Sequence, residues 1–192
     1  MSYQRKVIED HIKITDKDLD VDYYENFTDS SDYKSLVELG NSYKKLSKSS
    51  RTSLIFGESN IKYEVEYKGK IKIDETIDWR EVPLIKDLGD KIAKITNTKY
   101  TVCIFQWYPT GKVGIGSHRD KEMKPGTKIA GVSYGTSRNI KFINYNVSGS
   151  LQIKLDPGSL YVMNHPTNDK WLHSIMTSDA IEPRISLTYR DY

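Results

Sequence analysis

The run RISLTYR, from Arg184 to Arg190, alternates polar and apolar side chains without a break. Since the side chains of a strand point alternately to its two faces, the run predicts a strand whose two arginines share one face with Ser186 and Thr188. Arginines on the inward face of a β-structure are costly to desolvate unless anions meet them there. Because guanidinium groups bind carboxylates through paired hydrogen bonds, the run predicts a site for a ligand with a carboxylate at each end.

A histidine and a carboxylate, His118 and Asp120, stand two residues apart ahead of this run. On an extended backbone the two side chains point to the same face, where they could share a metal ion. Such a pair alone is more often a salt bridge or a cap, but the downstream arginines favour a metal site. A second histidine would complete the two-histidine, one-carboxylate set that holds ferrous ion with positions open for other ligands. His173 is the predicted partner because it lies in a strand-like run, whereas His165 precedes a proline in an apparent loop.

The remaining chain predicts short strands with a few helices. Residues 1–32 are polar and acidic, and we expect an extension that ends in a short strand, with no role that the sequence reveals. Apolar residues at helical spacing predict one helix from Ser31 or Asp32 to Ser47 and a second over 82–97. Strands are expected at 54–57, at 100–108, on both sides of a turn at 68–69, and at short intervals over 128–163.

Short strands punctuated by Gly, Asn and Pro at regular spacing are typical of a double-sheet barrel or sandwich. We therefore expect a mainly β protein with flanking helices (α+β). Its core is predicted to be a double-stranded β-helix, or jelly roll, braced by two helices on one face. With 192 residues in the chain, residues 33–192 are expected to form a single domain in which 100–192 make the jelly-roll core.

The composition indicates which cellular compartment and which partners this protein suits. A single cysteine, Cys103, excludes an internal disulfide and suits a reducing compartment. No apolar run reaches membrane length and no signal-peptide core is present, so we expect a soluble intracellular monomer that does not contact membranes. The net charge is +3, and residues 51–192 carry 21 basic and 16 acidic side chains, which favours a polyanionic partner only weakly.

The motifs together resemble the AlkB family of Fe(II)/2-oxoglutarate dioxygenases. Its H-x-D, distal histidine and R-x-N-x-T/S-x-R pattern correspond to His118–Asp120, His173 and Arg184–Arg190. The family's N-x-Y is similar to Gln106-Trp107-Tyr108, and its V-S-L-G-x-x-R is similar to the run from Val132 to Arg138. The chain departs from the pattern at Gln106 and Ser186, where the family usually has asparagine.

The resemblance implies a cofactor set and a role for each motif. Fe(II) would be held by His118, Asp120 and His173. The oxo acid 2-oxoglutarate would chelate it with Arg190 near its C1 end. The C5 carboxylate would meet Arg184 and Tyr108, and Gln106 and Ser186 would stand beside the same molecule. With O2, these groups would carry out oxidative demethylation of N-alkylated bases in DNA or RNA, releasing formaldehyde, succinate and CO2. An alkylated base edge is hidden in a duplex, so the substrate would be single-stranded or flipped.

The resemblance also implies a nucleotide-recognition lid over residues 51–80. Its expected substrate-binding side chains are Arg51, Phe56, Tyr63 and Tyr67, because aromatic rings on a lid could stack on an extruded base. The alternative is that alternating aromatics in a hairpin simply pack on the core. The family match favours stacking for at least one of them.

Two further residues and the substrate class leave alternatives open. Glu122 matches an acidic position near the substrate base in related enzymes, or it is a solvated loop carboxylate. Arg138 is expected to bind a substrate phosphate, or to pair with an acidic side chain on the barrel surface. The same cofactor chemistry could act on a protein or another substrate that is not a nucleic acid. A jelly-roll module that only binds its ligand is disfavoured by the complete set of metal and oxo-acid residues.

Overall fold

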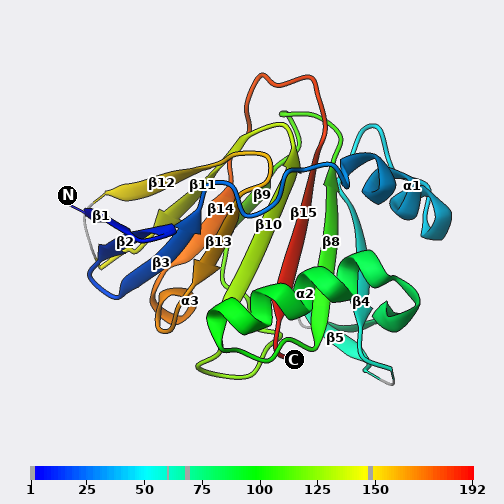
Figure 1. Ribbon diagram of the computed structural model, residues 1–192, viewed down its shortest axis with the longest axis horizontal. Helices are drawn as coiled ribbons and strands as arrows, with labels where there is room; N and C mark the ends of the chain where they lie inside the picture. The colour runs from blue at the N-terminus through cyan, green and yellow to red at the C-terminus, as the bar shows by residue number, and fades with distance from the viewer. Residues whose placement is uncertain (1–2, 60, 68–69, 147–148) are drawn as a thin grey trace.

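The computed structural model describes residues 3–59, 61–67, 70–146 and 149–192. A nine-stranded sheet, here called the main sheet, runs through the molecule (Figure 1). In spatial order its strands are β1 (Gln4–Ile8), β2 (His11–Asp16), β3 (Leu19–Tyr24), β13 (Leu160–Met163), β10 (Ile129–Gly135), β15 (Arg184–Arg190), β8 (Val102–Tyr108), β4 (Thr52–Gly57) and β7 (Ile77–Asp78). The second sheet contains β12 (Ser150–Leu155), β11 (Arg138–Ile143), β14 (Leu172–Ile175) and β9 (Ile115–His118).

Two helices cover one face of the main sheet, α1 (Tyr33–Tyr43) and α2 (Pro83–Thr96) (Figure 1). Helix α2 begins with a proline, follows a short 3-10 turn at Trp79–Glu81, and ends at Asn97 in the left-handed conformation. The apolar side chains of β15 face these helices, and the Tyr189 hydroxyl donates to the Ile85 carbonyl oxygen at 2.9 Å. The alternation in RISLTYR therefore places the apolar side chains against the helices and the polar side chains on the opposite face of the strand.

The polar face of β15 lies between the two sheets. Large side chains such as Phe142 and Trp171 are fully buried in this second core. Two sheets, antiparallel except for the parallel pair β4–β7, with helices on the outer face of the larger one confirm the predicted jelly-roll class, although the sheets do not close into a barrel. The two supporting helices were also predicted, but α1 ends at Tyr43 rather than at Ser47.

The N-terminal segment differs from its prediction. Instead of one short strand, it forms the meander β1–β2–β3, and β3 pairs with β13 so that the main sheet extends by three strands. In β2 and β3 every second side chain is buried, including Ile14 and Val21. The residues between them are polar or charged, with Lys13 in β2 and with Asp20 and Asp22 in β3, and the short strands made this period-two pattern hard to recognise in the sequence.

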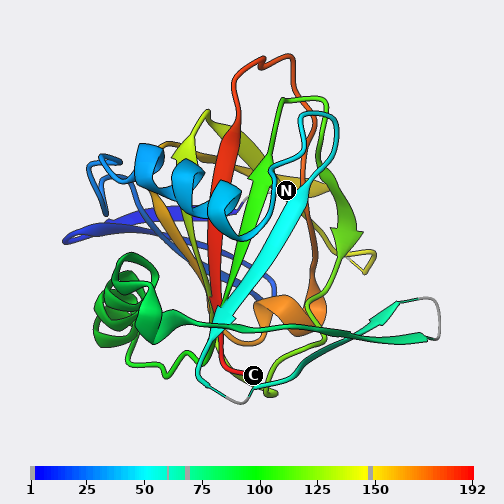
Figure 2. The ribbon, with the colours of Figure 1, turned by 90° about the vertical axis from the view of Figure 1, so that its right-hand side faces the viewer.

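The predicted hairpin is present as β5 (Tyr63–Tyr67) and β6 (Lys70–Asp74), while its turn at 68–69 lies outside the described residues. It projects from the body of the molecule beyond the edge of the main sheet (Figure 2). A short helix, α3 (Thr167–Lys170), precedes β14. Within the part of the chain that the structure describes, no helix is long and apolar enough to cross a membrane.

Candidate active site

The two predicted histidines lie side by side on neighbouring strands. His118 ends β9 and pairs in register with His173 of β14, and their ring centroids are 4.4 Å apart. Asp120 follows two residues after β9 and is buried. The Nε2 atoms of His118 and His173 lie 3.4 Å and 3.7 Å from the Asp120 carboxylate oxygens. The ligand atoms of all three lie within 4.8 Å of one another, a spacing that one metal ion can bridge.

The protonation of this cluster suits a cation. His118 Nδ1 is 2.9 Å from the Gly116 carbonyl oxygen. Burial lowers the pKa of His118, but the hydrogen bond and charge of Asp120 outweigh it and raise this pKa, so a cation at Nε2 would take the place of a proton. Burial, with help from His118 and Arg190, lowers the pKa of His173 to about 4, so its imidazole is neutral at pH 7. Burial opposes ionisation of Asp120, but Arg190 and the histidines outweigh it and hold the pKa of this carboxyl well below its usual range. Neutral imidazoles and a carboxylate are the donors that ferrous ion takes in such sites.

Arg190 connects this cluster to the hairpin. Its Nη2 lies 2.8 Å from Asp120 Oδ1, and its Nη1 donates to the Tyr63 hydroxyl at 2.9 Å. The same Nη1 is 4.0 Å from the Glu122 carboxylate. Asp120 Oδ2, by contrast, is buried without a hydrogen-bond partner among the described residues. One carboxylate oxygen of Asp120 is therefore fixed by Arg190, and the other is free for a metal.

Arg184 is completely buried at the opposite end of β15. Its Nη2 donates to the hydroxyls of Ser133 at 2.9 Å and Ser186 at 3.3 Å, but Nε and Nη1 have no partner in the described part of the chain. A buried guanidinium with free donors and no counter-ion is unfavourable by itself. The carboxylate of an oxo acid fits these unused donors.

Tyr108 lies beside Arg184 and is hydrogen-bonded to Gln106. The Arg184 Cζ atom lies 5.3 Å from the Tyr108 ring centroid, and the Tyr108 hydroxyl donates to Gln106 Oε1 at 2.7 Å. Gln106 thus orients the tyrosine hydroxyl. A small cavity of about 20 Å³ lies between the sheets beside the metal cluster; it is lined by residues that include Gln106, Tyr108, His118, Asp120, His173 and Arg190, and Arg184 lies outside its lining.

The four residues predicted to belong to the lid lie in different parts of the structure. Tyr63 is buried beside Arg190, so it reaches the site through its hydroxyl. Phe56 is fully buried in the core between the main sheet and the helices, which corrects its assignment as a stacking residue. Arg51 precedes β4, whose first residue pairs with Trp107, so it lies at the Arg184 end of the sheet. Six strand residues span about 20 Å, which separates Arg51 from the metal cluster and from the hairpin where a base was expected to stack. The side chain of Tyr67 lies outside the described residues.

Arg138 also differs from both of its expected roles. It is buried, and its guanidinium donates to the backbone carbonyls of Thr110, Val113 and Met176. Its donors are therefore occupied by the protein's own main chain, and no carboxylate of the described residues pairs with it. Glu122, in contrast, is brought to within reach of Arg190 and has only a small exposed fraction, 18% of its side chain.

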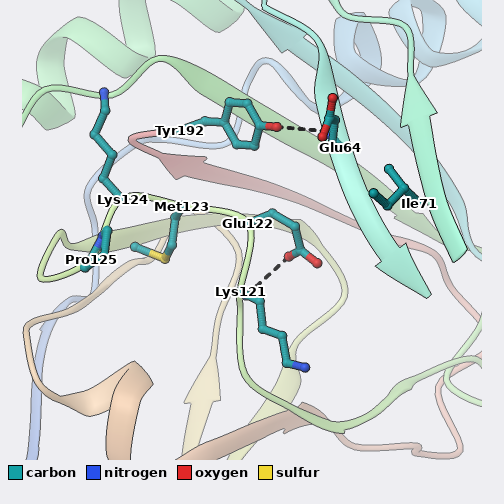
Figure 3. A pocket seen from close by; sticks show the side chains of 8 residues that line it. All are labelled: Glu64, Ile71, Lys121, Glu122, Met123, Lys124, Pro125 and Tyr192. Carbon is teal, nitrogen blue, oxygen red and sulfur yellow. Dashed lines mark hydrogen bonds between the residues drawn. The ribbon is translucent and has the colours of Figure 1, made fainter. Parts of the chain in front are cut away.

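A larger cavity of about 710 Å³ opens next to Glu122 (Figure 3). One wall is the hairpin, with Glu64 and Ile71, and the other is the loop of residues 121–125. The Tyr192 hydroxyl accepts from the Glu64 main-chain N–H at 3.0 Å and holds the hairpin over this cavity. Sequence reasoning missed Ile71 and Tyr192, although Ile71 belongs to the alternating pattern that predicted the hairpin.

Asn168 was also missed. Its side-chain amide binds both main-chain polar groups of Asp120, with Oδ1 3.0 Å from the N–H and Nδ2 2.7 Å from the carbonyl oxygen. Asn168 lies five residues before His173, but no pattern in the sequence there indicates a contact with Asp120.

The chain is similar in sequence to a family of known enzymes. The family model of the 2OG-Fe(II) oxygenase superfamily matches residues 32–190. DNA oxidative demethylase ALKBH2 of Homo sapiens is 32% identical over 120 residues, which cover 57% of this chain and 46% of that protein. Alpha-ketoglutarate-dependent dioxygenase alkB homolog 3 of Homo sapiens is 25% identical over 133 residues, covering 63% and 46%. The chain thus spans about half the length of these relatives.

The solved structure of OsALKBH1 has the same fold. The two align with a TM-score of 0.66 over 98% of this chain and 100% of that chain, at 11% sequence identity. These likenesses confirm the resemblance to AlkB-type enzymes that the sequence motifs predicted.

Proposed function

The chain belongs to the 2OG-Fe(II) oxygenase superfamily and so uses Fe(II), 2-oxoglutarate and O2, and from this premise we propose that it removes alkyl groups from the bases of DNA or RNA. The observation that carries the proposal is the cluster of His118, Asp120 and His173 one side chain away from the cavity beneath the hairpin. The human relative that is 32% identical is named a DNA oxidative demethylase, which supports a nucleic-acid substrate.

In this proposal the cluster holds the iron through three protein atoms. The bound metal and oxo acid together supply the oxidising chemistry. The protein's own contribution begins with Arg190, which fixes one oxygen of Asp120 and leaves the other for the metal. Arg184, with two unused donors, would take the distal carboxylate of 2-oxoglutarate, and the Tyr108 hydroxyl would turn its one proton from Gln106 Oε1 to the same carboxylate.

The substrate base enters between the hairpin and the loop of residues 121–125. This cavity is open to solvent at the surface, so a single-stranded or extruded base can reach it. Glu122 stands between the cavity and Arg190, where its carboxylate can accept a hydrogen bond from an amino group on the base edge. Ile71 provides an apolar contact on the facing wall.

The proposal is tested by incubating the protein with Fe(II), 2-oxoglutarate and methylated single-stranded DNA or RNA, and by measuring formaldehyde and succinate. Equal amounts of both products are expected. Asp120→Ala should reduce both to background, because the metal loses its only carboxylate. Asp179→Ala, which removes a carboxylate that is 98% exposed, serves as the matched control and should retain full activity.

Other outcomes separate the remaining possibilities. Succinate without formaldehyde, at the same rate with and without nucleic acid, would contradict a nucleic-acid substrate while keeping the cofactor chemistry. That result would favour a protein or another substrate that is not a nucleic acid. A fully active Asp120→Ala protein would overturn the metal assignment itself.

A further inference from the structure

Asp120 lies beyond the last residue of β9, in a segment without regular secondary structure. Its main-chain N–H and carbonyl therefore have no strand neighbour to bind. Both are bound instead by the Asn168 side chain, at 3.0 Å and 2.7 Å. A primary amide offers one acceptor and a donor in the same geometry as a peptide group, so Asn168 takes the place of a missing strand residue.

The helix that carries Asn168 cannot be ordered by its own hydrogen bonds. Helix α3 contains four residues, far below the length at which an isolated helix is stable. Its first residue, Thr167, is fully buried, and the Thr167 hydroxyl accepts from the Asp20 N–H at 2.7 Å and donates to the Asp20 carbonyl at 3.0 Å. The strand β3 of the N-terminal meander therefore anchors α3 on one side of Asn168.

The meander holds this segment at both of its ends. Before α3, the Asn164 amide donates to the carboxylates of Asp20 at 2.9 Å and Asp22 at 2.7 Å. After α3, the buried Trp171 indole donates to the Lys17 carbonyl at 2.9 Å. Residues 17–22 thus hold the chain from 164 to 171, and the middle of that chain holds Asp120.

We propose that Asn168 is a positioning residue for Asp120, and that the N-terminal meander acts as its support. Arg190 fixes one carboxylate oxygen of Asp120, and Asn168 fixes the backbone from which the carboxylate extends. Together they direct Oδ2, buried and without a partner among the described residues, toward His173, while Oδ1 faces His118. The inference rests on the proposed role of Asp120 as a metal ligand, and it gives residues 17–22 a function that the sequence did not reveal.

The test measures metal affinity rather than turnover. Co(II) is titrated into the 2-oxoglutarate-bound protein under anaerobic conditions, and its visible absorption reports the ligand field. Asn168→Ala removes both hydrogen bonds, and Asn168→Leu removes them while keeping a similar volume. We expect both variants to bind Co(II) about 10- to 100-fold more weakly, the range found when outer partners of metal ligands are removed. Lys170→Ala, in the same helix and exposed, should bind as the wild type does.

Hydrogen exchange of residues 119–124 provides a second readout. Both Asn168 variants should exchange faster there, and Thr167→Val should do so as well because it frees α3 from β3. Unchanged Co(II) affinity and unchanged exchange in a folded Asn168 variant would overturn the inference. If the wild-type protein did not bind Co(II), the metal assignment would fall and this inference with it. Wild-type binding with an unaffected Asn168→Leu variant would reject the positioning role alone.

Discussion

Arg184 is a single side chain whose environment is explained only by a ligand. It is fully buried, its Nη2 contacts two hydroxyls, and its other two donor nitrogens have no partner in the described chain. Replacing a buried, uncompensated charge with an apolar residue is often neutral or stabilising. We therefore expect Arg184 to lower the stability of the ligand-free protein, and under the proposed function it would bind the oxo-acid carboxylate.

Arg184→Met tests this balance. We expect the free energy of unfolding of the ligand-free protein to stay the same or rise by about 1 kcal/mol, because a desolvated charge is removed. The KM for 2-oxoglutarate should rise at least about 10-fold, since a charge-assisted hydrogen bond contributes about 1.5–3 kcal/mol. Urea unfolding and oxo-acid titration measure the two effects. A loss of more than 3 kcal/mol of stability with an unchanged KM would contradict the anion-binding role.

The residues of this site were predictable from the sequence where alternation and spacing determined them. The period of two in RISLTYR correctly put Arg184 and Arg190 on one face, away from Tyr189. The hydrophobic pattern could not distinguish Phe56 in the core from an aromatic on the lid, because both lie in strands. That distinction depends on which strands become neighbours, which a local pattern does not specify.

At the scale of the elements, Arg138 joins three segments of main chain. It lies at the start of β11 and binds the carbonyls of Thr110 and Val113, in the connection between β8 and β9, and of Met176, just after β14. The strands β9 and β14 carry the two histidines. Arg138 therefore links the backbone just before β9 to the backbone just after β14. Its Cζ also lies 5.8 Å from the Tyr108 ring centroid.

Arg138→Met should therefore destabilise the fold. Three carbonyls would lose their donor in a buried site, and we expect a loss of about 2–4 kcal/mol in the free energy of unfolding. Arg138→Lys should recover only part of this, because one ammonium group cannot reach three acceptors in the geometry of the guanidinium fork. Denaturant unfolding compares the two variants. A nucleic-acid affinity that fell in Arg138→Lys while stability was unchanged would restore the phosphate-binding hypothesis.

At the scale of the whole molecule, the site is assembled from distant parts of the chain. The metal cluster takes residues from β9, the loop after it and β14, while its supports come from α3 and the N-terminal meander. The motifs were visible in the sequence because each ligand has a characteristic residue type. The supports were not, because Asn168 and Thr167 act through main-chain hydrogen bonds that many polar residues can make.

We expect the metal ion and then 2-oxoglutarate each to raise the stability of this protein. A ligand at 100 times its Kd adds about 2.7 kcal/mol to the free energy of unfolding, and for a chain of this size each kcal/mol shifts the Tm by about 2–4 °C. We therefore expect Mn(II), used in place of iron to prevent turnover, to raise the Tm by about 5–10 °C. Adding 2-oxoglutarate should raise it again, and EDTA should reverse both shifts. Calorimetry should find neither shift in Asp120→Ala, and in Arg184→Met only the metal shift. A full 2-oxoglutarate shift in Arg184→Met would show that the oxo acid is held without the buried guanidinium.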